Sequence, residues 1–196
     1  MRFIRFDKLN CEGCPARELL NVARSRRIEA IRLRALRRLH GNPTILILCE
    51  SAATDRFVYD RTSNYDHHGL RFHLRKELIG DGTDDDLLRF LNERRVWIVD
   101  IAICPLLKGR KLANKQRREA ATLCLARHTR AYMDSFPSAK LLTMFPEHCG
   151  FLKRKLPDIT SRVSESFGFI AAGLKEALDF RTRSENHSNP SLNNSL

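Results

Sequence analysis

Three short and almost wholly apolar runs constrain the fold of this chain more than any other feature. They read TILILC at residues 44–49, VWIVDIAI at 96–103 and AKLLTMF at 139–145. Runs of this length that are rich in branched side chains and apolar at successive positions are typical of strands covered on both faces. Such strands occur in parallel sheets, so the sequence predicts a sheet of that kind.

Helical patterns alternate with these runs. They cover residues 66–79, 84–94 and 113–136, and two further helices are predicted at 16–40 and 166–180. Thr83 stands where an N-cap residue would be expected. Alternation of this kind predicts an α/β fold in which an open, mainly parallel sheet is flanked by helices in three α/β/α layers. We expect a single domain over residues 1–182 and a disordered tail over 183–196, which is rich in serine and asparagine.

Composition narrows the class of protein. The 196 residues are 42% hydrophobic, enough for one ordinary core, which excludes a wholly disordered chain. Lys and Arg number 35 against 23 Asp and Glu, and the net charge of +12 favours a polyanionic partner, nucleic acid first. No apolar run reaches the roughly 18 residues that span a bilayer, and residues 1–8 lack the apolar stretch of a signal peptide. We therefore expect a monomeric cytoplasmic protein with no membrane partner.

Open parallel sheets bind ligands at the carboxyl ends of their strands. Glu50 follows the first apolar run and Asp100 lies in the second, so both acids are predicted to face one crevice. Acids at such positions also commonly cap a helix or turn the chain, and that alternative stays open. Beside the crevice, the densest basic stretch offers charges that could hold DNA phosphates or form a solvated loop and helix start. It contains Lys108, Arg110 and Lys111, followed by Lys115, Arg117 and Arg118.

The six cysteines are interpreted as metal ligands or catalytic groups before disulfides, because an intracellular compartment is reducing. Cys11 and Cys14 form a C-x2-C pair, Cys104 follows the second apolar run, and Cys124 falls within the predicted helix 113–136. These four thiols can converge only if the N-terminal segment folds back over the sheet. Four thiolates suit a [4Fe–4S] cluster or a structural zinc ion equally well. The alternative is four unconnected buried cysteines and no metal.

The order of these features resembles the iron–sulfur uracil-DNA glycosylases over residues 11–180. In that family the first strand ends in Gly-Glu-Ala-Pro-Gly, where this chain has Cys-Glu-Ser-Ala-Ala at 49–53, with the acid kept at Glu50. The family's second strand ends in Thr-Asn, four residues before its third cluster cysteine, and Asp100 takes that place before Cys104. The chain is also similar to uncharacterised members of the superfamily with Gly-Glu-Ser-Pro-Pro followed by Phe and Tyr.

The resemblance implies a uracil-DNA-glycosylase-like fold and a [4Fe–4S] cluster held by the four cysteines named above. It also implies hydrolysis of the bond between a damaged base and its deoxyribose in DNA, with the nucleotide rotated out of the duplex. Asp100 is the first candidate to position water and stabilise the cationic sugar, and Glu50 the second. Phe57 and Tyr59 are candidates to hold the base, or else core residues, and Asn64 would read a base edge or form a turn.

One family feature is missing. Uracil-DNA glycosylases usually carry a His-Pro-Ser motif after the fourth strand, whose histidine stabilises the departing base, and residues 157–166 contain no histidine. Losing one such donor typically costs about 10²–10³ in rate. The alternative function is therefore a catalytically silent nucleic-acid-binding protein of the same fold. A metal-dependent nuclease using Glu50, Asp60 and Asp100 is a third hypothesis.

Overall fold

A four-stranded parallel sheet organises the chain. The computed structural model describes residues 11–19, 27, 30, 42–51, 58–59, 70–102, 104, 106, 113–143 and 146–164. The strands are β1 (Ile45–Ser51), β2 (Val96–Ala102), β3 (Lys140–Thr143) and β4 (Val163–Ser164). Their order across the sheet is β2-β1-β3-β4, and every pair is parallel. The predicted open parallel sheet is confirmed, and the three apolar runs supply β1, β2 and β3.

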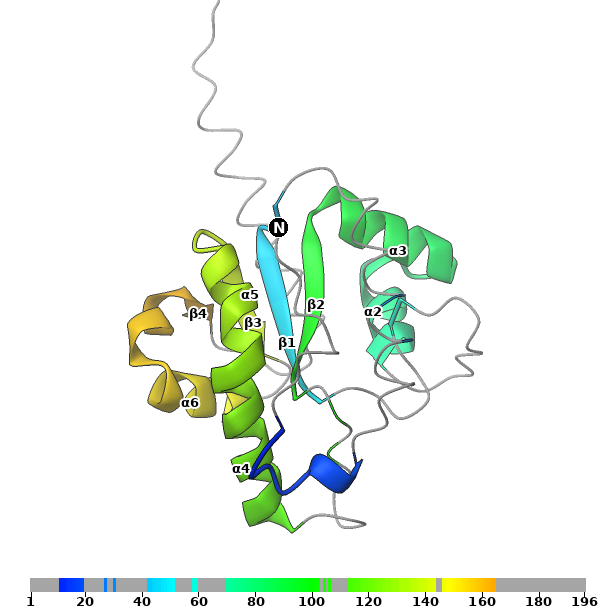
Figure 1. The fold of residues 1–196 in the computed structure, drawn as a ribbon. Helices are drawn as coiled ribbons and strands as arrows, with labels where there is room; N and C mark the ends of the chain where they lie inside the picture. Colours follow the sequence, from blue (N-terminus) through cyan, green and yellow to red (C-terminus); the bar gives the residue numbers. More distant parts are fainter. Residues whose placement is uncertain are drawn as a thin grey trace, which may run out of the picture.

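Helices cover both faces of the sheet (Figure 1). One side carries α2 (Leu70–Leu78) and α3 (Asp84–Glu93). The other side carries α4 (Asn114–Cys124), a π-helical turn η3 (Leu125–Thr129), α5 (Arg130–Ser135) and α6 (Pro146–Lys155). The arrangement is compatible with the predicted three-layer α/β/α architecture. Two short 3-10 helices complete the described elements, η2 (Arg17–Leu19) and η4 (Pro157–Arg162).

Two apolar clusters explain why the strands have no polar face. Ile47 and Ile98 pack with the leucines of α2 and α3 in one cluster. Leu48 and Val99 belong to a second cluster, together with Met133 of α5. Because successive side chains of a strand point to opposite faces, a strand buried on both sides must be apolar at nearly every position.

The predicted helices at 66–79, 84–94 and 113–136 are confirmed where the structure describes them, whereas the start of the predicted helix at 16–40 is the 3-10 helix η2. Thr83 is the N-cap of α3, with a reciprocal capping box to Asp86. The predicted helix at 113–136 is α4, η3 and α5 in succession, and the predicted helix at 66–79 is described from Leu70 onward as α2. The predicted helix at 166–180 and the predicted tail lie outside the described residues, as does most of 16–40. No helix in the described ranges has the length and apolar character needed to cross a membrane.

Candidate functional site at the carboxyl end of the sheet

The N-terminal segment folds back across the chain, as convergence of the thiols requires. Residues 11–19, blue in Figure 1, lie at the carboxyl end of β1 and β2, next to the start of α4. Ala16 is fully buried there, in a small cluster with Ala102, Cys104 and Cys124, and Cys14 packs against this cluster. The segment therefore joins the end of β2 to α4.

Cys104 and Cys124 belong to this cluster, Cys14 packs against it, and Cys11 lies near enough for the charges of Cys124 and Cys14 to act on its thiol. The hydrogen bond of Cys104 with Cys124, then burial, and then the charges of Cys124 and Cys14 raise the pKa of the Cys104 thiol. Burial and the charges of Cys124 and Cys14 raise the pKa of the Cys11 thiol as well. The pKa of each of these two thiols is therefore affected by other cysteines of the set, although Cys11 and Cys124 are far apart in sequence.

Four cysteine thiols are the type of donor that a tetrathiolate site requires. Four thiols come from three separate segments, and the other two cysteines, Cys49 and Cys149, lie in the two main apolar clusters. Among the described side chains, however, no group of three or more His, Cys, Asp or Glu has the arrangement of a formed metal site. The structure therefore brings the predicted ligands together without assembling a coordination sphere.

A compact turn presents the first two thiols. The backbone N–H of Cys14 donates to the carbonyl oxygen of Cys11 at 3.1 Å, and Gly13 has a φ of +68°, which glycine adopts without strain. The Arg127 guanidinium donates to the carbonyl oxygen of Glu12 at 2.8 Å, which ties the turn to η3. Arg127 and Arg17 also act to lower the pKa of Cys11, against the stronger effects that raise it.

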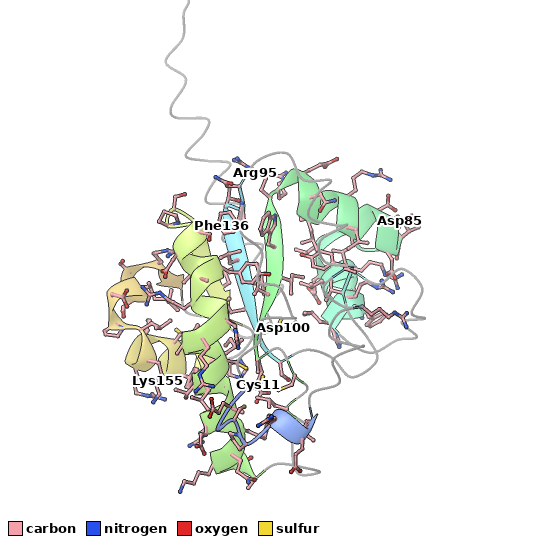
Figure 2. The ribbon with its side chains drawn as sticks, viewed as in Figure 1. Cys11, Asp85, Arg95, Asp100, Phe136 and Lys155 are labelled. Atoms are coloured by element: carbon pink, nitrogen blue, oxygen red, sulfur yellow. The ribbon has the colours of Figure 1, made fainter. Side chains whose placement is uncertain are left out.

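Asp100 lies close to the carboxyl end of β2 (Figure 2) and is 9% exposed. In the ladder it stands opposite Cys49. Its neighbours on the same face of β2 are Val96 and Ile98, which pack against α2 and α3. Strand alternation therefore directs the Asp100 side chain to the α2–α3 face. The Thr129 hydroxyl lies 3.2 Å from the carbonyl oxygen of Asp100 and 2.8 Å from that of Ile101.

Glu50 points to the opposite face. It shares its side of β1 with Leu46 and Leu48, which belong to the cluster under α5 and α6. Its carboxylate accepts a short hydrogen bond from the Arg117 guanidinium on α4. The expectation that Glu50 and Asp100 face one crevice is therefore corrected. Both acids stand at the same end of the sheet, on opposite faces, because they occupy positions of opposite parity in paired strands.

Tyr59 has a core position. It is 5% exposed in the cluster of α2 and α3, and its hydroxyl accepts a hydrogen bond from the backbone N–H of Ile98 at 3.0 Å. This placement matches the packing alternative, because stacking on a base requires an open aromatic face. The other residues predicted to contact base or DNA lie outside the described residues; they are Phe57, Asn64, Lys108, Arg110 and Lys111.

Arg162 lies just before β4, within the range 157–166 that lacks the expected histidine. Its guanidinium donates to the carbonyl oxygens of Met133, Phe136 and Ala139, at distances between 2.6 and 3.2 Å. These bonds hold the turn between α5 and β3. Arg162 therefore has a structural role here.

Comparison of the chain with protein-family models, with curated proteins and with solved structures gives no significant match. The functional argument therefore depends on the chemistry of this end of the sheet. Sequence reasoning counted Arg117 only as part of a basic stretch and missed Arg127 and Thr129. No signal in the sequence separates Arg117 from the cations beside it, and a contact across more than 100 residues leaves no local signal for Arg127.

Proposed function

We propose that this protein is a uracil-DNA-glycosylase-like DNA-binding protein that hydrolyses the N-glycosidic bond of uracil or another damaged base. The observation that carries the proposal is the gathering of Cys11, Cys14, Cys104 and Cys124 at the carboxyl end of a parallel sheet, next to the strand that bears Asp100. Ligands of open parallel sheets bind at this end. The resemblance in the order of cysteines and strand-end acids supports the same assignment.

In this proposal Asp100 is the catalytic carboxylate. A carboxylate near the sugar would stabilise the developing oxocarbenium ion and orient the attacking water. Asp100 suits that role because it is largely buried and because the end of β2 is fixed by Thr129. Glu50 is less suited, since the Arg117 guanidinium already occupies its carboxylate.

Excision is tested on single- and double-stranded oligonucleotides that contain one uracil, followed by treatment with alkali. We expect strand breaks that depend on alkali, and a loss of at least about 10²-fold in rate for Asp100→Asn. Asp85→Asn, an exposed acid on α3 far from Asp100 (Figure 2), is the matched control and should retain the full rate. Breaks without alkali that require magnesium would favour the nuclease hypothesis instead.

A catalytically silent nucleic-acid-binding protein is the second candidate. It is favoured by the absence of histidine from residues 157–166 and by the backbone contacts of Arg162, which leave that segment without its expected donor. Tight binding to DNA that weakens steeply with salt, with no abasic product from a panel of damaged bases, would establish this function in place of excision.

We also propose that the four thiols hold a [4Fe–4S] cluster, with structural zinc as the alternative. Either group would fasten the N-terminal segment to β2 and α4 and would perform no chemistry on the base. Protein purified without oxygen should be brown and contain iron and sulfide in equal amounts. Cys124→Ser should lose both, and the buried control Cys149→Ser should keep them. Colourless protein that contains zinc would establish the alternative, and metal-free wild-type protein would reject both.

A further inference from the structure

The Arg117 side chain connects three segments at the proposed site. It donates from Nη2 to the Glu50 carboxylate at the end of β1 and from Nε to the carbonyl oxygen of Leu106 at 3.2 Å. Its own backbone N–H bonds to the carbonyl oxygen of Ala113 in the first turn of α4. One guanidinium thus links the end of β1, the segment just after Cys104, and a helix.

Burial separates Arg117 from its cationic neighbours on α4. The Arg117 side chain is 11% exposed, whereas Lys115 and Arg118 are exposed residues. A guanidinium that is largely buried, charge-paired and bonded to a backbone carbonyl would have to break these bonds and leave its place to reach a phosphate in solvent. Among the described cations at the start of α4, Lys115 and Arg118 therefore face outward and Arg117 faces inward.

We infer that Arg117 is a positioning residue that fixes the Glu50 carboxylate and the Leu106 carbonyl relative to α4, and that it does not bind DNA phosphate. The inference rests on the proposed function only in assigning the chemical role to Asp100 and a structural role to Glu50. It implies that Glu50 sets the shape of this end of the sheet by holding Arg117.

The pairing is tested first by a double-mutant cycle in chemical unfolding, which needs no activity. We expect Arg117→Ala to raise the unfolding equilibrium constant at least about tenfold. In a Glu50→Gln background, Arg117→Ala should raise the unfolding equilibrium constant by a clearly smaller factor, because the charged partner of Arg117 is already gone. Arg117→Lys should recover part of the loss only when Glu50 is present, since lysine keeps the charge and lacks the forked donors. Additive effects of the two single changes would overturn the inference.

The second arm measures how DNA binding depends on salt. Removing one phosphate contact lowers the slope of log K against log salt by about 1. Arg117→Ala should leave that slope unchanged, and Arg118→Ala, the exposed neighbour, should reduce it. A reduced slope for Arg117→Ala would show a phosphate contact and reject the positioning role. If the wild-type protein binds no DNA, the proposed function fails while the unfolding cycle still decides the role of Arg117.

Discussion

Several arginines of this protein bind its own carbonyl and carboxylate oxygens. Arg71 is 1% exposed and meets Asp84 at 2.9 Å, and Arg130 bonds both oxygens of Asp158, which lowers the pKa of that carboxyl. Arg117 and Arg162 are held in the same way. Fewer cations than the 35 Lys and Arg residues are therefore available to a polyanionic partner, because these arginines are committed to oxygens of the protein itself.

Arg95 offers a prediction at this scale. It is the only non-glycine residue with positive φ, at 55°, among those that the structure describes, and it lies in the turn before β2 (Figure 2). The left-handed conformation costs a side chain roughly 1–2 kcal/mol, more than the chain entropy that glycine adds. Arg95→Gly should therefore stabilise the protein by about 0.5 kcal/mol in urea unfolding.

The neighbouring residue supplies the control for that prediction. Arg94 is the C-cap of α3 with a φ of −83°, an ordinary right-handed conformation. Arg94→Gly gains no relief of strain and should destabilise the protein by about 0.5–1 kcal/mol. Equal effects of the two glycine substitutions would contradict the strain argument.

At the scale of elements, some features could be predicted from the sequence because they depend on local patterns. Three apolar runs supplied three strands, and Thr83 fixed the start of α3. The two-residue β4 could not be predicted, since Val163 and Ser164 form no recognisable run. The π-helical turn at Leu125–Thr129 was also missed, because its extra residue is accommodated by packing on β2 rather than by any residue preference.

The cap of α3 gives a prediction that depends on pH. The Thr83 hydroxyl and backbone N–H both donate to Asp86, at 2.6 and 2.8 Å, and these bonds lower the pKa of that carboxyl below its ordinary 3.8. Thr83→Ala should cost about 1 kcal/mol in urea unfolding at pH 7. Because the folded-state pKa is the lower one, the carboxylate's share of this stabilisation is present above pH 3.8 and is lost as the pH falls further. A cost that stays constant down to pH 2 would contradict the role of the carboxylate.

At the scale of the whole molecule, the site was harder to predict than the fold. The gathering of the four cysteines was an expectation that came from the family resemblance, with four unconnected cysteines as the alternative. The facing of Glu50 and Asp100 was predicted wrongly, because a strand that is apolar on both sides carries no signal of which side chain points to which face. Only the register between β1 and β2 settles their opposite directions.

Docking of the N-terminal segment is tested by Ala16→Glu. Ala16 is fully buried against Ala102 and Cys124, so a buried carboxylate should release residues 11–19. Hydrogen exchange followed by mass spectrometry should show faster exchange in residues 11–19 and in the adjoining part of α4. Helix α3, which packs on the other side of the sheet, should exchange as in the wild type. Uniformly faster exchange would mean that the segment does not dock as a separate unit.

The bond between Arg127 and the carbonyl oxygen of Glu12 joins residues 115 positions apart. Such a contact cannot form on the ribosome until Arg127 has emerged, and its long loop closure makes it slow. Cys11 and Cys14 therefore remain free thiols until Cys104 and Cys124 have been synthesised. During that interval the nascent chain is open to premature oxidation, so we expect the yield of correctly assembled protein to depend on how reducing the cell is during translation.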